Sequence, residues 1–308
     1  MRWLSMAWTP EPTYPKPDIS VAATTTYYEI VAPLILPFAE RRLLNLFRCR
    51  EGRCFFQRNR EYPPSGDAFR DPIRFVPVTQ KNGRTEDYLY VEAIAGIIAC
   101  AEADSVEFHG WGSRQGDVER PDRMVIDLDP DEGWRSSWSR NRRCNRSLGA
   151  LGLESFAMLT GGKGIHVVVP LTPQAQRPEV RAFAKAFCTA LADVDPARFT
   201  IALPKEQRRG RIFLDFLRNQ RTATAILPYS ARARAGSPVA APVSWNELQR
   251  IGRAEHFRIT DAASLLRRAE RRALRGWGIA RQRLPRLACV NFRGAGPLES
   301  SYWNWALK

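Results

Sequence analysis

A short stretch with two closely spaced carboxylates, Arg123–Asp131 (RMVIDLDPD), constrains the fold of this chain more than any other. Its apolar, β-prone first half predicts a buried strand, and alternate residues of a strand share one face. Asp127 and Asp129 would therefore lie side by side at the end of that strand. Two carboxylates this close repel each other unless a cation joins them, and a divalent metal ion with oxygen ligands is the usual solution. The alternative is a strand that ends in an acidic turn, which Pro130 and Gly133 also fit.

Two later apolar stretches carry chemistry of a matching kind. Residues 159–170 read LTGGKGIHVVVP, with a glycine turn, Lys163 and His166. Residues 211–219 read RIFLDFLRN, where Asp215 is a third carboxylate inside an apolar run. Two metal ions holding a nucleoside triphosphate would require carboxylates together with a phosphate-binding turn and cationic side chains. Taken alone, the GGKG stretch fits an ordinary glycine-rich hairpin turn better than it fits a phosphate site.

Two familiar motifs are excluded at these stretches. DLDPDEG begins like an EF-hand loop, but Glu132 stands where that loop requires glycine and Trp138 stands where it requires a bidentate Glu. GGKG is not a P-loop, because Gly164 replaces the required Ser or Thr. Successive glycines still allow backbone N–H groups to converge on an anion. The turn therefore remains a candidate phosphate site.

The charge of the chain favours an anionic partner. Its 308 residues contain 47 Lys and Arg against 32 Asp and Glu, a net charge of +15, and nucleic acid is the commonest partner for such a balance. Eight arginines lie between Leu265 and Arg286 with one acid, Glu270, and we expect the segment from Trp245 onward to be helical. A basic helix is usually a solvated face, but this density favours phosphate contacts.

The cysteines and the hydropathy indicate the compartment. Six cysteines show neither C-x-x-C nor zinc spacing, so we expect reduced, mostly buried thiols of a cytosolic protein. The N-terminus lacks a long apolar core, and we expect no apolar run to approach membrane-spanning length. Neither a signal peptide nor a membrane partner is therefore expected.

Periodicity predicts a mixture of helices and strands. Helices are expected over 24–42, cut or kinked at Pro33 and Pro37, and over 92–102, 134–153 and 179–191. Hairpins are expected from 43–47 with 54–57, from 73–78 with 88–91, and from 155–160 with 165–171. Strands over 106–111 and 211–217 and an extended run over 225–233 complete the set.

Two further sites carry open alternatives. Phe55 and Phe56 are adjacent, so in a strand one would face the core and the other would face outward. An outward Phe beside Arg53 and Arg58 is a base-stacking platform, but a two-sided core strand with a charged end fits equally well. A lone histidine is more often a satisfied core residue than a ligand, but His109 closely precedes the carboxylate strand, which strengthens the case for an active-site role.

These stretches together resemble the polymerase domain of bacterial ATP-dependent DNA ligase D, which belongs to the archaeo-eukaryotic primase superfamily. The resemblance rests on DLDPD, TGGKGIHVVVPL and RIFLDFLRNQRTATAILPYSARARAGSPV, with FFQ, EFH and ERPDR in the same order, and spans about 27–284. It implies an α+β primase-like fold, with an RRM-like catalytic sheet of largely antiparallel strands and an N-terminal α/β subdomain. We expect an N-terminal arm over 1–20, the catalytic domain over 21–285 and a C-terminal tail over 286–308.

The resemblance also implies site residues. Asp127, Asp129 and Asp215 match the catalytic metal ligands for two Mn²⁺ or Mg²⁺ ions. Nucleotide binding is expected of Thr160, Lys163, His166, His109, Arg218, Arg232 and Arg234. DNA contact is expected of Phe55, Phe56, Arg53, Arg58, Arg208 and Lys16. Two departures from the family pattern are FFQRN in place of FFQKH, and Val21 near the usual lysine, which leaves Lys16 as the substitute for binding a 5′-phosphate.

The activity implied is template-directed nucleotidyl transfer to primer 3′-ends at DNA breaks or gaps in non-homologous end joining. The implied ligands are DNA ends with a 5′-phosphate and NTPs or dNTPs, with NTPs favoured. The implied partners are a Ku-like end-binding protein and a DNA ligase, since no Lys-x-Asp-Gly ligase motif is present, and the implied location is the cytoplasm, with the nucleoid. Two alternatives are a non-catalytic module that binds or bridges DNA ends, and a primase that needs no primer.

Overall fold

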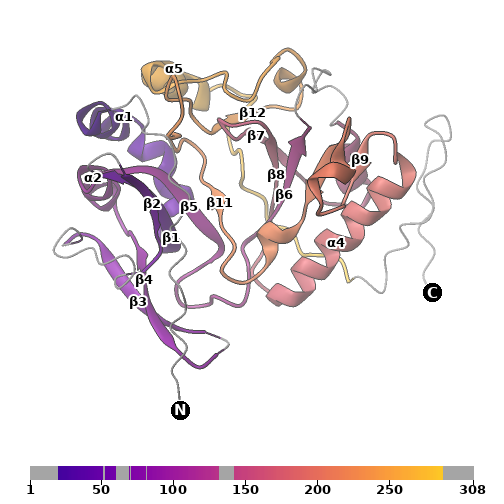
Figure 1. Ribbon diagram of the computed structural model, residues 1–308, viewed down its shortest axis with the longest axis horizontal. Coiled ribbons are helices and arrows are strands. Elements are labelled where there is room, and N and C mark those ends of the chain that lie inside the picture. The colour runs from indigo at the N-terminus through magenta and orange to yellow at the C-terminus, as the bar shows by residue number, and fades with distance from the viewer. Residues whose placement is uncertain are drawn as a thin grey trace.

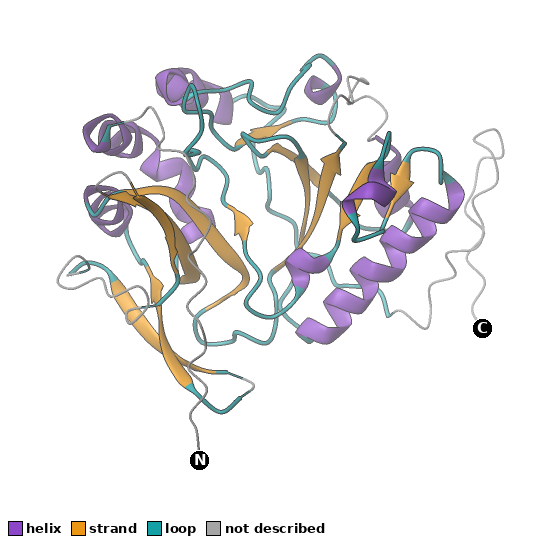
Figure 2. Cartoon of the chain, in the orientation of Figure 1, coloured by secondary structure: helices purple, strands orange, loops and turns teal. Residues whose placement is uncertain are grey.

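The structure of this chain is a computed structural model, and it describes residues 20–50, 53–59, 69, 71–80, 82–131 and 142–286. Two six-stranded sheets lie side by side, with helices on their outer sides (Figures 1 and 2). This is the mixed α/β architecture that was predicted. Lys16, most of the expected arm and nearly all of the expected tail lie outside the described residues.

The first sheet, called the N-terminal sheet below, has the order β11-β5-β1-β4-β3, with β2 paired to β1. Every pairing in it is antiparallel. The strands are β1 (Arg42–Arg50), β2 (Arg53–Gln57), β3 (Arg74–Thr79), β4 (Thr85–Tyr90), β5 (Ser105–Arg114) and β11 (Ala225–Ile226). The predicted hairpins β1–β2 and β3–β4 are confirmed, whereas the extended run over 225–233 contributes only the two residues of β11.

Helices α1 (Val21–Ala39) and α2 (Ile94–Glu102) pack against each other and against β5. The Ser20 side chain caps α1 by accepting a hydrogen bond from the backbone N–H of Ala23, 3.1 Å away. Of the expected cut or kink at Pro33 and Pro37, the cut is wrong, because α1 runs through both positions. Extensive burial of its apolar side chains offsets the local cost of the two prolines.

Among the described helices, α1 alone has the length and hydropathy of a membrane span. This differs from the expectation that no apolar run approaches that length. In the structure one face of α1 is buried in the core of the domain, where Tyr27, Tyr28 and Val31 are at most 2% exposed. The hydroxyls of Tyr27 and Tyr28 each donate a 2.7 Å hydrogen bond to a carbonyl elsewhere in the domain, that of Tyr229 and that of Val106.

The second sheet, called the carboxylate sheet below, has the order β12-β7-β8-β6-β10-β9. Its pairings are antiparallel except for that between β9 and β10. The strands are β6 (Arg123–Pro130), β7 (Phe156–Leu159), β8 (Ile165–Pro170), β9 (Phe199–Thr200), β10 (Ile212–Asp215) and β12 (Ala241–Val243). The predicted β7–β8 hairpin and the three motif-bearing strands are confirmed.

Helices α3 (Arg142–Ala150) and α4 (Arg177–Val194) contribute to the core on one side of the carboxylate sheet. Met124, Ile126 and Leu128 of β6 are fully buried in one hydrophobic cluster with apolar residues of α4. The pleat of β6 therefore sends Asp127 and Asp129 to the opposite face, as the sequence predicted.

The C-terminal part of the described chain differs from the expected long helix. It contains two short 3₁₀ helices, η5 (Glu247–Gln249) and η6 (Ile259–Asp261), and only α5 (Ala262–Ala269) is α-helical. Gly276 and Gly278 adopt positive φ angles of 76° and 74°, which L side chains resist, so the basic stretch turns instead of continuing α5. Trp277 then packs under the edge of the carboxylate sheet and donates to the carbonyl of Ala157.

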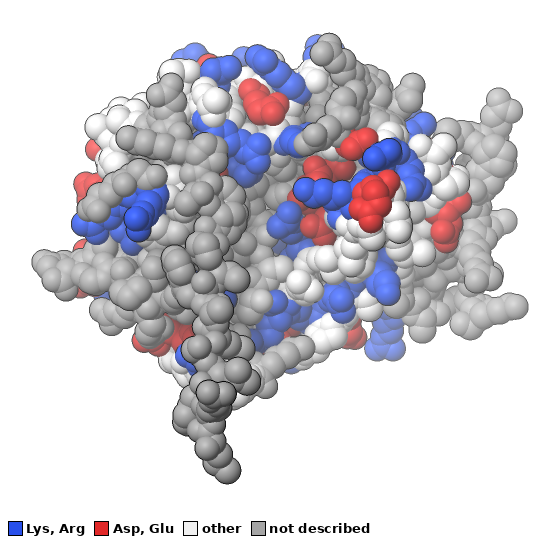
Figure 3. Space-filling view, viewed as in Figure 1, with Lys and Arg blue, Asp and Glu red and all other residues white. Residues whose placement is uncertain are grey.

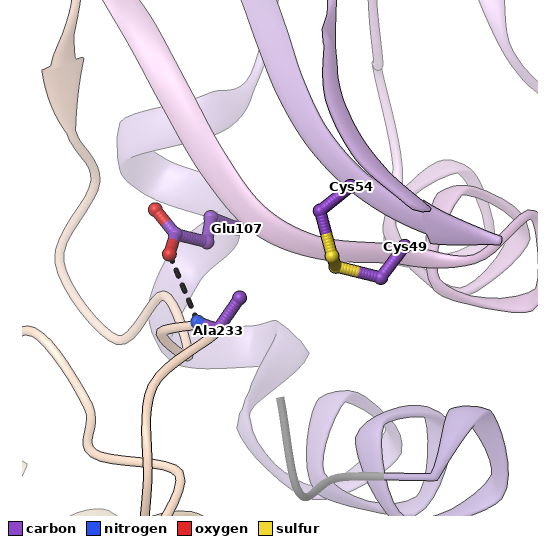
Figure 4. The surroundings of a disulfide bond; sticks show 4 residues. All are labelled: Cys49, Cys54, Glu107 and Ala233. Atoms are coloured by element: carbon purple, nitrogen blue, oxygen red, sulfur yellow. Dashed lines mark hydrogen bonds between the residues drawn. A yellow bond between two sulfur atoms is a disulfide. The ribbon is translucent and has the colours of Figure 1, made fainter. Parts of the chain in front are cut away.

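The expectation that all cysteines are reduced is also wrong. The register of the β1–β2 hairpin sets Cys49 opposite Cys54 with a Cα–Cα distance of 4.1 Å, and a disulfide joins them (Figure 4). Directly opposed residues of an antiparallel strand pair lie close enough together for such a bond. Cys100, Cys144 and Cys188 are free and buried, as expected.

Candidate functional site

The three predicted carboxylates meet on one face of the carboxylate sheet. Asp127 on β6 lies directly opposite Asp215 on β10 in the antiparallel register, and opposite His166 on β8 at its other side. Asp129 follows two residues along β6 on the same face as Asp127. Three sequence motifs separated by dozens of residues thus converge because β6 is the central strand between β8 and β10.

Arg218, on the 3₁₀ helix η4 (Leu217–Asn219), joins two of these carboxylates. Its Nη2 lies 3.0 Å and its Nε 3.2 Å from Oδ2 of Asp127, and its Nε lies 3.2 Å from Oδ2 of Asp215. His166 Nε2 lies 3.6 Å from the same Asp127 oxygen. Cationic or polar groups on two sides therefore stabilise Asp127 as an anion.

The pKa values of the carboxylates reflect this arrangement. Burial opposes ionisation of Asp127, but His166 and Arg218 outweigh it and hold the pKa of Asp127 at about 2. Burial, together with the charge of Asp127, raises the pKa of Asp129 and of Asp215 above their usual value. The site is thus rich in negative charge that the side chains of the chain neutralise only in part.

The donor set suits a divalent metal, but the present side-chain positions do not form a closed metal site. Within the described ranges, no group of three His, Cys, Asp or Glu residues is arranged to hold a metal ion. Arg218 accounts for this, because its guanidinium stands between Asp127 and Asp215. Three partly buried carboxylates, two with raised pKa values, have the chemistry of hard oxygen ligands that an added cation would stabilise.

The glycine turn between β7 and β8 approaches the carboxylates closely. A Cβ on Gly164 would lie 2.4 Å from the carbonyl oxygen of Leu128, so only glycine allows this loop to touch β6. Thr160 closes the turn, because its hydroxyl donates to the carbonyl of Gly164 at 2.8 Å and accepts from the N–H of Gly162 at 3.2 Å. Thr160 is buried and shapes the turn.

Four predicted cationic residues surround this turn and the carboxylates. Arg232 Nη1 donates to the carbonyl of Thr160 at 2.9 Å, and the Arg234 guanidinium carbon would lie 3.5 Å from a Cβ on Gly162. Lys163 and Arg208 both lie close enough to lower the pKa of Asp129. Arg208 is oriented by stacking over Phe213, 3.6 Å from the ring centroid.

His109, on β5 of the N-terminal sheet, contacts a carboxylate that the sequence analysis missed. Below, the region bounded by the three aspartates, the glycine turn and His109 is called the cleft. Its Nε2 lies 2.7 Å from Oε2 of Glu107, which is also 3.1 Å from Nε of Arg232. The other oxygen of Glu107 accepts a 2.9 Å hydrogen bond from the N–H of Ala233 (Figure 4). One buried carboxylate therefore fixes His109 and Arg232 relative to each other.

Phe55 and Phe56 lie on β2, for which a base-stacking platform and a two-sided core strand were the two alternatives. Phe55 and Phe56 are both half-buried, so neither is simply inward or outward. The Phe56 ring contacts His109 at a centroid distance of 5.3 Å, whereas Phe55 lies 5.5 Å from the Arg48 guanidinium. Phe56 is thereby tied to the cleft. Arg53 lies at the opposite end of β2 from these contacts, at the disulfide-bonded hairpin.

Asn219 is a second residue that the sequence analysis missed. Its side-chain amide accepts from the N–H of Val125 at 2.8 Å and donates to the carbonyl of Val125 at 2.7 Å. It thus substitutes for a neighbouring strand beyond the end of β10 and anchors η4, which carries Arg218, to β6. Its position next to Arg218 in the motif DFLRN could have indicated its role. In the same way, the position of Glu107 in the motif EFH could have indicated the role of Glu107.

Glu107 links the stability of the domain to pH. Burial would raise the pKa of Glu107, but Arg232, His109 and the Ala233 N–H lower it from 4.5 to about 2. A lowered pKa contributes stability that is fully present above pH 4.5 and is lost as the pH falls towards about 2. For a shift of this size the contribution to the free energy of unfolding is about 3 kcal/mol. We expect Glu107→Gln to lower the free energy of unfolding by a similar amount at pH 7, measured by urea denaturation.

The difference in the free energy of unfolding between Glu107→Gln and the unaltered chain should shrink as the pH is lowered from 4.5 towards 2. Protonation then neutralises the Glu107 carboxylate of the unaltered chain as well. Glu247→Gln is the matched control for the loss of a carboxylate that pairs with a buried arginine. Glu247 also pairs with a buried arginine, Arg268, but outside the cleft. A constant difference across this pH range would contradict the assignment of the charge of Glu107 as the stabilising feature.

Comparison with known proteins identifies the family. The family model described as "LigD, primase-polymerase domain" matches residues 22–272. The multifunctional non-homologous end joining protein LigD of Pseudomonas aeruginosa is 37% identical over 173 residues, 56% of this chain and 21% of that protein. The LigD protein of Mycolicibacterium smegmatis is 28% identical over 242 residues, 76% of this chain and 31% of that protein.

A solved structure supports the same conclusion. The polymerase domain from Mycobacterium tuberculosis ligase D, in complex with DNA, superposes with a TM-score of 0.73 and 25% identity, covering 81% of this chain and 89% of that one. The matched regions are about a fifth to a third of the length of the two LigD proteins named above. This chain belongs to the LigD primase–polymerase domain family.

Proposed function

We propose that this chain is a metal-dependent, template-directed nucleotidyltransferase that extends primer 3′-ends at DNA breaks or gaps. The observation that carries the proposal is the convergence of Asp127, Asp129 and Asp215 beside a glycine turn flanked by Arg232 and Arg234. A phosphate chain seated on that turn would place its reacting phosphorus near the carboxylates. Figure 3 shows Lys and Arg side chains along the hollow between the two sheets, with acidic atoms beside them on the side of the carboxylate sheet.

The roles follow from the positions of the side chains. Asp127, Asp129 and Asp215 would hold two Mn²⁺ or Mg²⁺ ions, which supply activation of the primer 3′-hydroxyl and neutralise charge on the leaving pyrophosphate. Lys163, Arg232 and Arg234 would bind the triphosphate through charge-assisted hydrogen bonds. Phe56 and Arg208 would position the template. The contribution of the protein is mainly orientation and electrostatic stabilisation.

Arg218 and His166 would keep the carboxylates in place before the substrate arrives. Arg218 already bonds Asp127 and Asp215 from η4, so it prevents two neighbouring anions from separating. If the carboxylates held cations, the Arg218 guanidinium would be free to bind the phosphates instead. Arg218 would thus hold the carboxylates together before the substrate binds, and would contribute to phosphate binding afterwards.

The wider role is also a proposal. The LigD relatives are named as multifunctional end-joining proteins, and the structural neighbour is described as a complex with DNA. By this likeness, the chain would act in non-homologous end joining on ends with a 5′-phosphate, beside a Ku-like protein and a DNA ligase, in the cytoplasm with the nucleoid. Ribonucleotides would be the favoured substrates.

Primer extension on a gapped duplex with a 5′-phosphate, with Mn²⁺ and either NTPs or dNTPs, tests the proposal. We expect addition to the primer, faster with NTPs, and no product when the primer is omitted. Product without primer would indicate a primase. No product together with tight, salt-sensitive DNA binding would indicate a non-catalytic bridging module.

Glu107→Gln should also affect catalysis through Arg232. Without its carboxylate partner, Arg232 is less firmly held against the glycine turn, so we expect the KM for the nucleotide to rise about tenfold with a smaller change in kcat. The control Glu247→Gln should lose stability without this change in KM. An equal effect of both variants on KM would show that the loss is general and not local to the cleft.

A further inference from the structure

A cavity of about 670 Å³ is lined by none of the three carboxylates, and the proposed reaction assigns no role to it. Its volume falls within the ~300–1,000 Å³ typical of ligand pockets. It is bounded by the end of β2 and the β3–β4 hairpin on one side, and by the start of α4 and the turn after η4 on the other. Its charged lining residues are Arg58, Glu86, Glu119, Arg177, Arg181 and Arg221.

Positive charge is in excess in this cavity. Arg221 Nε lies 2.8 Å from Glu119, and Arg58 lies 3.8 Å from Glu86, so two of the four arginines have carboxylate partners. Arg177 and Arg181 form no ion pair within the described residues, and the four arginines and two glutamates of the lining leave an excess of two positive charges. Such an excess favours an anionic ligand.

Arg177 gives the stronger indication of a ligand. It is only 3% exposed, yet its Nε and Nη1 have no hydrogen-bond partner among the described residues. Its Nη2 donates to Ser113 Oγ and to the carbonyl of Val118, so the side chain is held in place. Burial lowers the pKa of Arg177 to about 10. A buried guanidinium with unused donors is costly unless an anion compensates it.

The position of the cavity connects it to the catalytic site. Arg58 comes two residues after Phe56, which contacts His109. Arg221 comes three residues after Arg218, which bonds Asp127. Thr222, which also lines the cavity, has a positive φ of 67°, a strained backbone conformation that is concentrated at functional sites. A nucleic-acid strand that passes Phe56 and leaves the cleft on this side would reach the cavity.

We propose that this cavity binds a backbone phosphate of the single-stranded template as it leaves the catalytic cleft. The proposal rests on the proposed function. It adds Arg177, Arg181 and Arg221 to the expected DNA contacts, of which Arg58 is already one. Phosphate is favoured over a base because Tyr88, the aromatic lining residue, is 2% exposed and offers no open face for stacking.

Arg181→Glu is the test variant, because Arg181 is exposed on α4 and its replacement leaves the core intact. Lys185→Glu is the matched control: it makes the same charge change on an exposed position one helical turn further along α4, outside the cavity lining. Arg177→Lys is the second variant. It keeps the buried charge but loses the planar set of donors.

The assay measures the affinity of the full chain for gapped DNA by fluorescence anisotropy, with short and with long single-stranded template extensions, over a range of salt concentrations. In the unaltered chain we expect the longer extension to tighten binding. Arg181→Glu should remove most of that gain and reduce the salt slope by about one phosphate contact, roughly 0.7 in log K per log salt for a single strand. Arg177→Lys should remove part of the gain, and Lys185→Glu should retain it.

Three outcomes would overturn the proposal: no gain from the longer extension, an equal loss in Arg181→Glu and Lys185→Glu, or displacement of the extension by inorganic pyrophosphate at concentrations that leave the duplex bound. The last outcome would assign the cavity to a free phosphate compound. Templated primer extension by the unaltered chain, with no loss of affinity in Arg181→Glu, would reject this site alone. A loss of affinity in Arg181→Glu, together with no primer extension by the unaltered chain, would instead reject the proposed function.

Discussion

Replacing Asp127 with Ala is expected to reduce templated primer extension by at least about 10³-fold, the largest effect on activity among the substitutions discussed. Asp127 lies between Asp215 and His166 in the sheet and accepts both hydrogen bonds from Arg218. Its loss removes a central oxygen ligand and releases Arg218 as well. Single-nucleotide incorporation under saturating Mn²⁺, followed by gel electrophoresis, measures the change.

DNA affinity of the Asp127→Ala variant should stay within about threefold of the unaltered chain, because removing a carboxylate from a basic cleft does not weaken phosphate contacts. Asp127→Asn is the matched control for size, and it should be as inactive as the alanine variant. Retained extension with lost DNA binding would contradict the assignment of Asp127 to catalysis.

Replacing Asn219 with Leu is expected to cause a loss of stability as large as that of Glu107→Gln. The Asn219 amide satisfies both backbone groups of Val125 inside the domain, and it is only 4% exposed. Leucine has a similar size but leaves a buried N–H and a buried carbonyl unpaired, at about 1–3 kcal/mol each. We expect a loss of about 3 kcal/mol, or roughly 6–12 °C in Tm, measured by thermal denaturation.

Gln220→Leu, at the adjacent exposed position, is the control and should change stability by less than about 0.5 kcal/mol. Activity of Asn219→Leu should fall even at temperatures where it is fully folded, since η4 and Arg218 lose their anchor on β6. A variant with unaltered stability would show that Val125 finds other partners, and that Asn219 does not anchor η4.

The parts of the fold that the sequence predicted correctly depend on local patterns. The pleat of β6 places Asp127 and Asp129 on one face whatever the partner strands are. The β1–β2, β3–β4 and β7–β8 hairpins join neighbouring segments, so turn residues and alternation suffice to predict them. The convergence of the three motifs was expected from the family resemblance, and the antiparallel register of β6 with β8 and β10 accounts for it.

The parts that were missed or wrong depend on contacts across long sequence separations or on a competition between effects. Glu107 gains its role from Arg232 and Ala233, more than a hundred residues away. Local helix rules predicted a cut or kink in α1 at its prolines, but the helix is not cut there, because burial of its inner face offsets their cost. Cys49 and Cys54 were judged by compartment, although their hairpin register makes them neighbours.

The most direct test of the central claim is a set of four gapped duplexes that differ only in the templating base, each offered one nucleotide at a time with Mn²⁺. We expect each duplex to incorporate the complementary nucleotide preferentially, and all incorporation to disappear in Asp127→Ala. Incorporation that ignores the templating base, or persists in Asp127→Ala, would contradict template-directed transfer at these three carboxylates.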